Sequence, residues 1–196
     1  MKARRVVLLT LAVAAVGFCL AYLFVSRSRQ LDAALHDPNP AVRAAAVRSL
    51  DRESETERLL DALKDENADV RILGAMRLGG YYSGRTPQEP EKRALGLIEA
   101  LKDRHAGVRR CAAESLGELW PASEAALTEA LTDSEPRARA GAAFALSQVR
   151  DGKVYRKMTP GESKAVLPLL RDLLNDDDPE VRANATRAID RISPAK

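Results

Sequence analysis

The residues that could carry catalysis are few and scattered along this 196-residue sequence. The two histidines, His36 and His105, fall between predicted helices, where a solvated histidine is the ordinary case. Cys19 lies in an apolar run and Cys111 at an apolar helix position, so neither a disulfide framework nor a metal-type cysteine spacing is present. No Cys–His pair, Ser–His–Asp arrangement or Gly-rich phosphate loop can be proposed. We therefore expect no catalytic residues, no metal site and no cofactor.

Two further motifs have simpler explanations than a site. The acidic run from Asp176 to Asp178 could attract a cation, but aspartate at a helix start accounts for it. Asn184, Ala185 and Thr186 fit the N-glycosylation triplet, but they fall in the middle of a predicted helix.

A phrase with fixed internal spacing recurs five times: a Leu, an Asp two residues later, a Val or Ala five residues after the Asp, and then an Arg. Its Asp and Arg members are Asp37 and Arg43, Asp65 and Arg71, Asp103 and Arg109, Asp133 and Arg139, and Asp176 and Arg182. Because the Arg recurs at one position in every copy, we interpret the set as a structural ladder. Each Arg would bind an Asp or a carbonyl in a neighbouring turn, a role that suits its planar, multi-donor guanidinium. The alternative is an anion-binding stripe.

The positions around this phrase have the period of helices. Apolar or small residues fall four and eight residues after each Val or Ala, as with Ala112 and Leu116. Leucines before each Asp follow the same rule, and Pro, Asn or Gly after the Asp marks a turn. Each copy is therefore predicted to be helix, turn, helix. A single amphipathic pair cannot bury its apolar stripe, so the pairs must stack into a solenoid.

The phrase D-x-x-x-x-V-R-x-x-A-A-x-x-x-L resembles the short HEAT-like repeats first named from phycobilisome bilin lyases, over about residues 31–193. With this resemblance we expect an all-α fold, a right-handed α-solenoid of five HEAT-like helix pairs. The pairs are expected at about 31–52, 55–80, 87–120, 123–150 and 160–193, within a repeat domain of residues 31–196. The resemblance implies little about activity, because this repeat occurs in unrelated scaffolds.

Residues 1–30 differ from the rest and predict a membrane anchor. Val6–Val25 is a 20-residue run without charge, which as a helix would span roughly 30 Å, the thickness of a bilayer's hydrocarbon core. A cleaved signal peptide is the alternative, but its apolar region is usually shorter and ends in a small-residue cleavage site. Lys2, Arg4 and Arg5 precede the run and Arg27 and Arg29 follow it. This bias favours a single-pass protein with a cytoplasmic N-terminus and an extracytoplasmic repeat domain.

Two connections between repeats are longer than the others, and each leads into Thr-Pro-x-Glu, at 86–89 and 159–162. This sequence predicts a helix start with a Thr N-cap, Pro at the first helical position and a capping box closed by Glu. The connections supply candidate partner-binding residues, namely Tyr81, Tyr82, Arg85, Lys153, Tyr155, Arg156 and Lys157. Tyr and Arg are frequent at interaction hot spots. The alternative is that the tyrosines pack the loops onto the solenoid.

A second candidate surface lies on the second helices of the pairs. Ile72, Met76 and Phe144 fall two or six residues after the repeat Val or Ala, away from the packing stripe. Apolar residues in such a groove can mark a partner site. The alternative is packing between adjacent second helices.

The charge distribution helps to separate the classes of function. Of the 31 cations, five lie in residues 1–30, which hold no acid, so residues 31–196 carry 26 cations against 28 acids. A nucleic-acid-binding domain usually has a strong basic excess, so we expect no nucleic acid partner. We predict a membrane-tethered interaction scaffold or adaptor that binds a protein partner, is held to the membrane through residues 6–25, and has no catalysis of its own. The alternative is an auxiliary subunit of an enzyme complex, such as a bilin-lyase-like chaperone subunit.

Overall fold

The computed structural model describes residues 25–26, 28–51, 55–79, 88–149 and 158–193. The chain divides into two units, Met1–Ala46 and Val47–Lys196. In the first unit, residues 28–35 are helical, and a turn leads from them into α2 (Pro40–Ser49), which crosses the boundary between the units.

The second unit consists of consecutive helix pairs. The described helices are α3 (Thr56–Ala62) and α4 (Ala68–Leu78), α5 (Pro90–Ala100) and α6 (Ala106–Glu118), α7 (Glu124–Ala130) and α8 (Pro136–Gln148), and α9 (Pro160–Asp172) and α10 (Pro179–Ile192). A short 3₁₀ turn, η1 (Leu173–Asn175), follows α9. Each pair falls within one of the ranges predicted from the recurring phrase.

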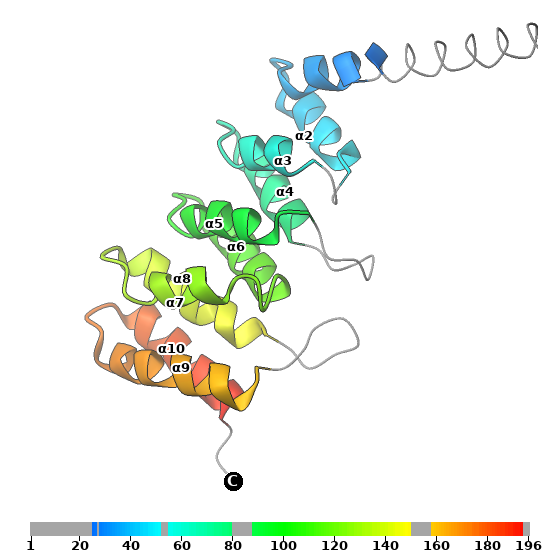
Figure 1. The fold of residues 1–196 in the computed structure, drawn as a ribbon. Helices are drawn as coiled ribbons and strands as arrows, with labels where there is room; N and C mark the ends of the chain where they lie inside the picture. Colours follow the sequence, from blue (N-terminus) through cyan, green and yellow to red (C-terminus); the bar gives the residue numbers. More distant parts are fainter. Residues whose placement is uncertain (1–24, 27, 52–54, 80–87, 150–157, 194–196) are drawn as a thin grey trace, which may run out of the picture. The chain divides into compact units, whose positions relative to one another are not determined.

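These pairs form two layers (Figure 1). The second helices α4, α6, α8 and α10 pack side by side in chain order. The first helices α3, α5 and α7 contact one another in the other layer, and α9 packs on α10. The prediction of an all-α repeat solenoid is therefore confirmed.

The core is built from leucine and small residues, which allows the helices to approach closely. The positions four residues after the repeat Val or Ala are buried, namely Gly74, Ala112, Ala142 and Ala185. Gly117 shows how close the approach is. A Cβ there would lie 2.9 Å from the Gln148 Cβ and 3.0 Å from the Ala145 carbonyl oxygen. Stacking of α6 on α8 therefore requires a residue without a side chain at this position.

The two predicted helix starts differ in the structure. At α9 the capping box is present, because the Thr159 N–H donates to Glu162 Oε2 (2.6 Å) and the Glu162 N–H donates to Thr159 Oγ1 (3.2 Å). The start predicted at 86–89 is wrong, because α5 begins at Pro90 and Glu89, at φ 51°, is its N-cap. A helix starting at residue 87 would place Pro90 where a backbone N–H must donate to the N-cap carbonyl, and proline has none. The first helices of these two pairs are nevertheless longer, 11 and 13 residues against 7 in α3 and α7.

No helix in the part of the chain that the structure describes is both long enough and apolar enough to cross a membrane. The span predicted at Val6–Val25 lies outside the described residues, apart from Val25.

Candidate functional site

The recurring Asp begins the turn within each of the five repeats in the same way. Its carboxylate accepts a hydrogen bond from the backbone N–H two residues later, the geometry of an Asx turn. The five bonds run from Asn39 to Asp37 (2.8 Å), Asn67 to Asp65 (2.8 Å), His105 to Asp103 (2.7 Å), Glu135 to Asp133 (2.8 Å) and Asp178 to Asp176 (3.0 Å). The Asp is therefore needed to form the turn, independently of any ligand.

The recurring Arg closes the same turn from the helix that follows it. In each copy its Nη1 donates to the carbonyl of the Asp and to that of the next residue. The distances are 2.9 and 3.2 Å for Arg43, 2.9 and 3.0 Å for Arg71, 2.9 and 3.3 Å for Arg109, 2.8 and 3.0 Å for Arg139, and 2.6 and 2.9 Å for Arg182. The carbonyls lie in the turn of the arginine's own repeat, whereas the sequence suggested a neighbouring turn.

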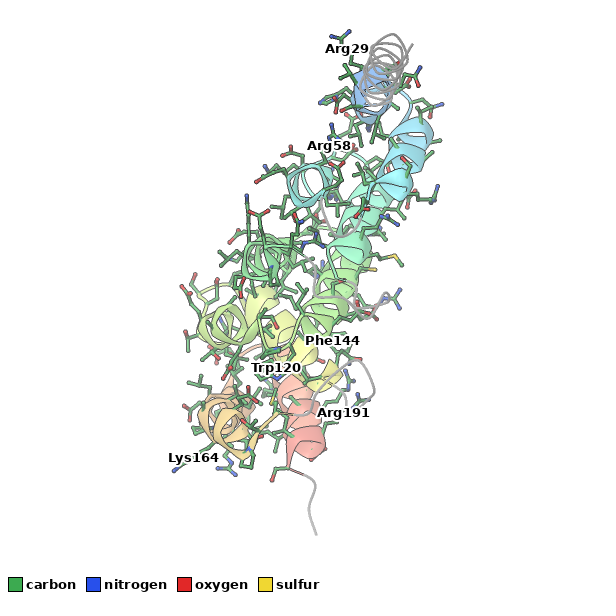
Figure 2. The ribbon with its side chains drawn as sticks, turned by 45° about the vertical axis from the view of Figure 1, so that its right-hand side comes forward. Arg29, Arg58, Trp120, Phe144, Lys164 and Arg191 are labelled. Carbon is green, nitrogen blue, oxygen red and sulfur yellow. The ribbon has the colours of Figure 1, made fainter. Side chains whose placement is uncertain are left out.

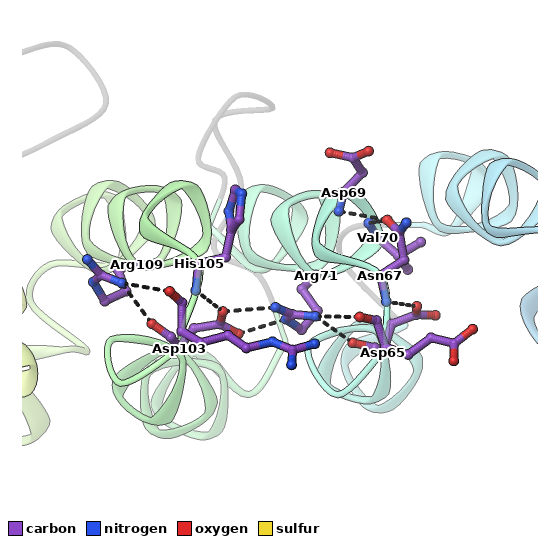
Figure 3. A network of polar contacts seen from close by, with 10 residues as sticks. Asp65, Asn67, Asp69, Val70, Arg71, Asp103, His105 and Arg109 are labelled. Atoms are coloured by element: carbon purple, nitrogen blue, oxygen red, sulfur yellow. Dashed lines mark hydrogen bonds and ion pairs between the residues drawn. The ribbon is translucent and has the colours of Figure 1, made fainter.

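Arg71 and Arg139 also reach the next repeat through their remaining donors. Arg71 donates from Nε and Nη2 to the two carboxylate oxygens of Asp103, at 2.7 and 2.9 Å (Figure 3). Arg139 makes the same paired contact with Asp176, at 2.7 and 2.9 Å. Such bidentate ion pairs fix both distance and orientation, so they link successive turns of the solenoid.

Arg109 departs from this arrangement. The Asp that it would reach, Asp133, is instead paired with Lys102 at 2.8 Å. Among the described residues, none accepts a hydrogen bond from Nε or Nη2 of Arg109, and only its Nη1 is engaged, by the turn carbonyls (Figure 3). Arg109 therefore keeps two donors that Arg71 and Arg139 use within the fold.

The ion pairs shift the acidity of the turn aspartates. Burial disfavours the charged form of Asp103, but the hydrogen bonds from Arg71 and from the His105 N–H outweigh it, so the pKa of Asp103 is lowered. The hydrogen bond from Arg139 lowers the pKa of Asp176, and that from Lys102 lowers the pKa of Asp133. All three carboxylates are thus held ionised as parts of the framework.

A cavity of about 290 Å³ opens between the second helices α6, α8 and α10. Its lining comprises Ala106, Arg109, Arg110, Ala113, Arg137, Ala140, Gly141, Phe144, Glu180, Asn184 and Arg187. The apolar part is therefore alanine, glycine and one aromatic ring, and the charged part is four arginines and one glutamate. Phe144, labelled in Figure 2, contributes the only aromatic side chain of this lining.

Contacts across the cavity hold its aromatic and cationic groups in place. Asn184 is buried, and its Nδ2 donates to the Ala140 carbonyl of the neighbouring helix at 3.1 Å. Its Oδ1 accepts from Arg187 Nη1 at 3.1 Å. The Arg187 guanidinium carbon lies 5.8 Å from the centre of the Phe144 ring, within the range of a cation–π contact. Arg187 and Phe144 are therefore positioned before any ligand arrives. The buried amide of Asn184 also agrees with setting the glycosylation triplet aside.

The apolar residues predicted on the second helices are not brought together. Phe144 lines the cavity, whereas Ile72 and Met76 do not. Ile72 lies against the start of α6, where its Cδ1 would be 3.1 Å from a Cβ at Gly107. This is packing between adjacent second helices, the alternative explanation for the residue. Met76 is 47% exposed on α4.

The candidates on the two long connections lie outside the described residues, namely Tyr81, Tyr82, Arg85, Lys153, Tyr155, Arg156 and Lys157.

The repeat geometry agrees with a comparison of the sequence against known families. A model of HEAT repeats matches residues 56–146, 94–161 and 124–196, which together cover well over half of the chain. The chain belongs to the HEAT-repeat family. The Asp turn, the Arg that closes it and the two-layer stack are therefore features of a HEAT-repeat protein.

Several solved structures resemble this HEAT-repeat chain. An engineered protein shares 21% identity over 83% of this chain and 78% of its own, with a TM-score of 0.48. A designed armadillo repeat protein in complex with the peptide (KR)4 shares 17% identity over 83% and 80%, with a TM-score of 0.43. A second designed armadillo repeat protein shares 18% identity over 85% and 82%, with a TM-score of 0.44. No curated protein matches the chain.

Metal-binding and thiol groups are the remaining candidates for chemistry in this HEAT-repeat protein. Among the described residues, no group of His, Cys, Asp or Glu could hold a metal ion. Cys111 is buried, and its burial raises the pKa of its thiol. The negative charge of Glu114 raises this pKa further, so the reactive thiolate is disfavoured.

One important polar residue, Arg93, was not anticipated from the sequence. It is fully buried, and its Nε donates to Thr56 Oγ1 (3.0 Å) and to the Gln88 carbonyl (2.9 Å), while Nη1 donates to the Leu78 carbonyl (3.4 Å). One guanidinium therefore joins the start of α3, the end of α4 and the entry to α5. Burial lowers the pKa of Arg93, an effect opposed by the charges of Glu89 and Asp51. In the last pair, the position ten residues before the repeat Asp is the apolar Val166. This apolar residue is the signal in the sequence that the equivalent residue 93 points inward, and both residues are buried.

Proposed function

We propose that this chain is a membrane-tethered protein-interaction scaffold without catalysis of its own, and that the cavity between α6, α8 and α10 is its main binding site. The observation that carries the proposal is the cavity itself, in which an aromatic ring and four arginines meet. Arginine and aromatic residues, including phenylalanine, are enriched at protein interfaces. Stacked repeats also present a continuous row of second helices, the surface that solenoid proteins use for binding.

The size of the cavity suits part of a protein better than a whole small molecule. Pockets that enclose drug-sized ligands usually measure about 300–1,000 Å³. At about 290 Å³ this cavity falls just below that range. A few side chains of a bound segment would fill it, and neighbouring surface of α6, α8 and α10 would support the rest of the partner.

The test is site-specific photo-cross-linking of the full-length chain in its native host. A cross-linking amino acid at position 144 lies in the cavity, and one at position 171 lies on the exposed surface of α9 as a matched control. We expect position 144, and not position 171, to form an adduct with a defined protein. Equal labelling from both positions, or no protein adduct from position 144, would argue against the cavity as the binding site.

The tether in this proposal is supported by the sequence of residues 1–30 alone. We expect the full-length chain to remain with membranes after alkaline carbonate extraction, and a chain lacking residues 1–30 to be released. Protease added to intact cells should reach the repeat domain, since the flanking cations favour an extracytoplasmic location. Release of the full-length chain by carbonate would refute the tether without affecting the cavity.

A further inference from the structure

The cavity contains cationic groups that the fold does not use. Nε and Nη2 of Arg109 have no acceptor among the described residues, because Lys102 occupies the Asp133 carboxylate. The exposed side chain of Arg110, on the next position of α6, has no hydrogen-bond or ion-pair partner there either. Arg137 has only a long contact of 3.9 Å with Glu135, at an exposed position.

The rest of the repeat domain does not share this excess of positive charge. Residues 31–196 carry 26 cations and 28 acids, whereas the cavity lining carries four arginines and one glutamate. Positive charge is therefore in excess around this cavity. Charge complementarity of this kind selects among partners and speeds their encounter.

From the donors left unused around this cavity, we propose that it binds an acidic peptide segment of the partner, a step that rests on the proposed function. Arg109 and Arg110 donate to side-chain carboxylates of the segment, and Arg187 donates to a further one. Guanidinium groups suit this role because they bind carboxylates through two parallel hydrogen bonds. An apolar side chain of the segment packs on the Phe144 ring and on the alanines of α6 and α8.

The positioning of Arg187 favours binding of an ordered segment. Its guanidinium is already bound by Asn184 Oδ1 and lies over the Phe144 ring. Less side-chain entropy is lost on binding when a donor is held in advance. Nε and Nη2 of Arg187 have no hydrogen-bond acceptor among the described residues.

An acidic peptide fits these observations better than a nucleic acid does. A nucleic acid gains affinity from many phosphate contacts along an extended basic surface. Here the cavity lining carries four arginines and one glutamate, whereas residues 31–196 carry 26 cations against 28 acids, so the domain has no overall basic excess to offer a long polyanion. The apolar part of the lining, with Ala113, Ala140 and Phe144, also favours an apolar group, which a peptide supplies.

The test is fluorescence anisotropy with the full-length chain in nanodiscs, with empty nanodiscs as a blank. The probes are labelled eight-residue peptides that share one phenylalanine and three alanines and differ only in carrying four Glu, four Gln or four Lys residues. A single-stranded oligothymidylate of eight nucleotides is the nucleic-acid probe. We expect the Glu peptide to bind at least about tenfold more tightly than the other three probes, and its affinity to fall as salt rises.

Arg110→Gln and Arg171→Gln are the matched variants, because each removes one exposed arginine and Arg171 lies on α9, away from the cavity. We expect Arg110→Gln to weaken binding of the Glu peptide about threefold to tenfold. The double variant Arg109→Gln with Arg110→Gln should weaken this binding further, and Arg171→Gln should leave it unchanged. Thermal melts by circular dichroism establish that each variant is folded. Arg110 makes no hydrogen bond or ion pair with the described residues, so its single variant remains informative if the double variant is unstable.

The outcomes separate this inference from the function on which it rests. If the Gln or Lys peptide binds as tightly as the Glu peptide and Phe144→Ala weakens it, the cavity binds peptides but the acidic preference is wrong. If the oligothymidylate binds more tightly than the Glu peptide, the preferred ligand is a nucleic acid and the inference is refuted. Equal effects of Arg110→Gln and Arg171→Gln would also refute it. If none of the probes binds, the acidic-peptide inference fails, while the photo-cross-link at position 144 still decides the proposed function.

Discussion

Arg71 and Asp103 join two successive repeats through one bidentate ion pair. The Arg71 Nε and Nη2 lie 2.7 and 2.9 Å from the two Asp103 carboxylate oxygens, and the two side chains are only 7% and 12% exposed. The same guanidinium binds the Asp65 carbonyl through Nη1 at 2.9 Å. One residue therefore fastens the turn before α4 and the turn before α6. In a solenoid, where stability depends on contacts between neighbouring repeats, such a contact couples adjacent units.

Replacement of Arg71 should destabilise the fold more than replacement of Arg109. Arg71→Gln leaves the largely buried Asp103 carboxylate without its ion pair and should lower the free energy of unfolding by about 3 kcal/mol. Arg109→Gln loses only turn hydrogen bonds and should cost about 1 kcal/mol. Urea denaturation of the two variants measures the difference. Equal losses would mean that the Asp103 pair contributes little beyond the turn contacts.

Acid should weaken the repeat stack through its turn aspartates. The pKa values of Asp103, Asp133 and Asp176 are lowered in the folded chain, so their contribution is present above the unfolded pKa of about 3.9 and is lost as pH falls through the lower folded values. We therefore expect the free energy of unfolding to fall with decreasing pH below about 4. Urea midpoints between pH 6 and pH 3 test this. Asp176→Asn should reduce the pH dependence, and an unchanged slope in that variant would contradict the assignment.

Gly117→Ala should be destabilising although alanine is the better helix former. The added Cβ would lie 3.0 Å from the Ala145 carbonyl oxygen, so α6 and α8 must separate slightly. Overpacking of this kind costs about 1–3 kcal/mol, which exceeds the roughly 1 kcal/mol gained in helix propensity. A lower thermal midpoint by circular dichroism is the expected result. As a control, Gly161→Ala meets only Thr159 Oγ1, at 3.9 Å, and should not be destabilising. A Gly117→Ala variant as stable as the parent would show that the helices can separate without cost.

Arg93 should not tolerate lysine. Arg93→Met leaves the Thr56, Gln88 and Leu78 acceptors without their donor and should cost about 2 kcal/mol. Arg93→Lys should cost at least as much, because one ammonium cannot reproduce the guanidinium fork and remains buried. Urea denaturation compares the two variants. Parental stability in Arg93→Lys would show that charge alone suffices at this position.

Much of the fold follows from the recurring phrase because each of its members has a local role. Asp forms the turn, Arg closes it, and the small residue four positions after the Val or Ala allows close packing, as at Ala112. These contacts span few residues, so a sequence pattern can capture them. The helix start predicted at 86–89 is wrong although the Thr-Pro-x-Glu pattern is present there. Pro90 has no backbone N–H to donate, which excludes a helix from beginning at residue 87.

The cavity could be predicted only in part, because it depends on contacts between residues far apart in the sequence. Phe144 was identified from its position in the repeat, but Asn184 and Arg187 meet it only once α10 packs on α8. The different role of Arg109 was hidden for a related reason. The repeats of Arg71 and Arg109 both carry a lysine directly before the Asp, but Lys64 pairs with Asp61 whereas Lys102 reaches Asp133 of the next repeat.

The most direct test of the central claim is hydroxyl-radical footprinting of the full-length chain, with and without the partner identified by cross-linking. It compares oxidation of Phe144 in the cavity with oxidation of Met76 on α4 and of Tyr82 and Tyr155 on the two long connections. We predict that the partner protects Phe144 and leaves Met76, Tyr82 and Tyr155 as reactive as in the free chain. Protection of Tyr82 and Tyr155 with Phe144 unchanged would contradict the account and place the binding surface on the connections instead.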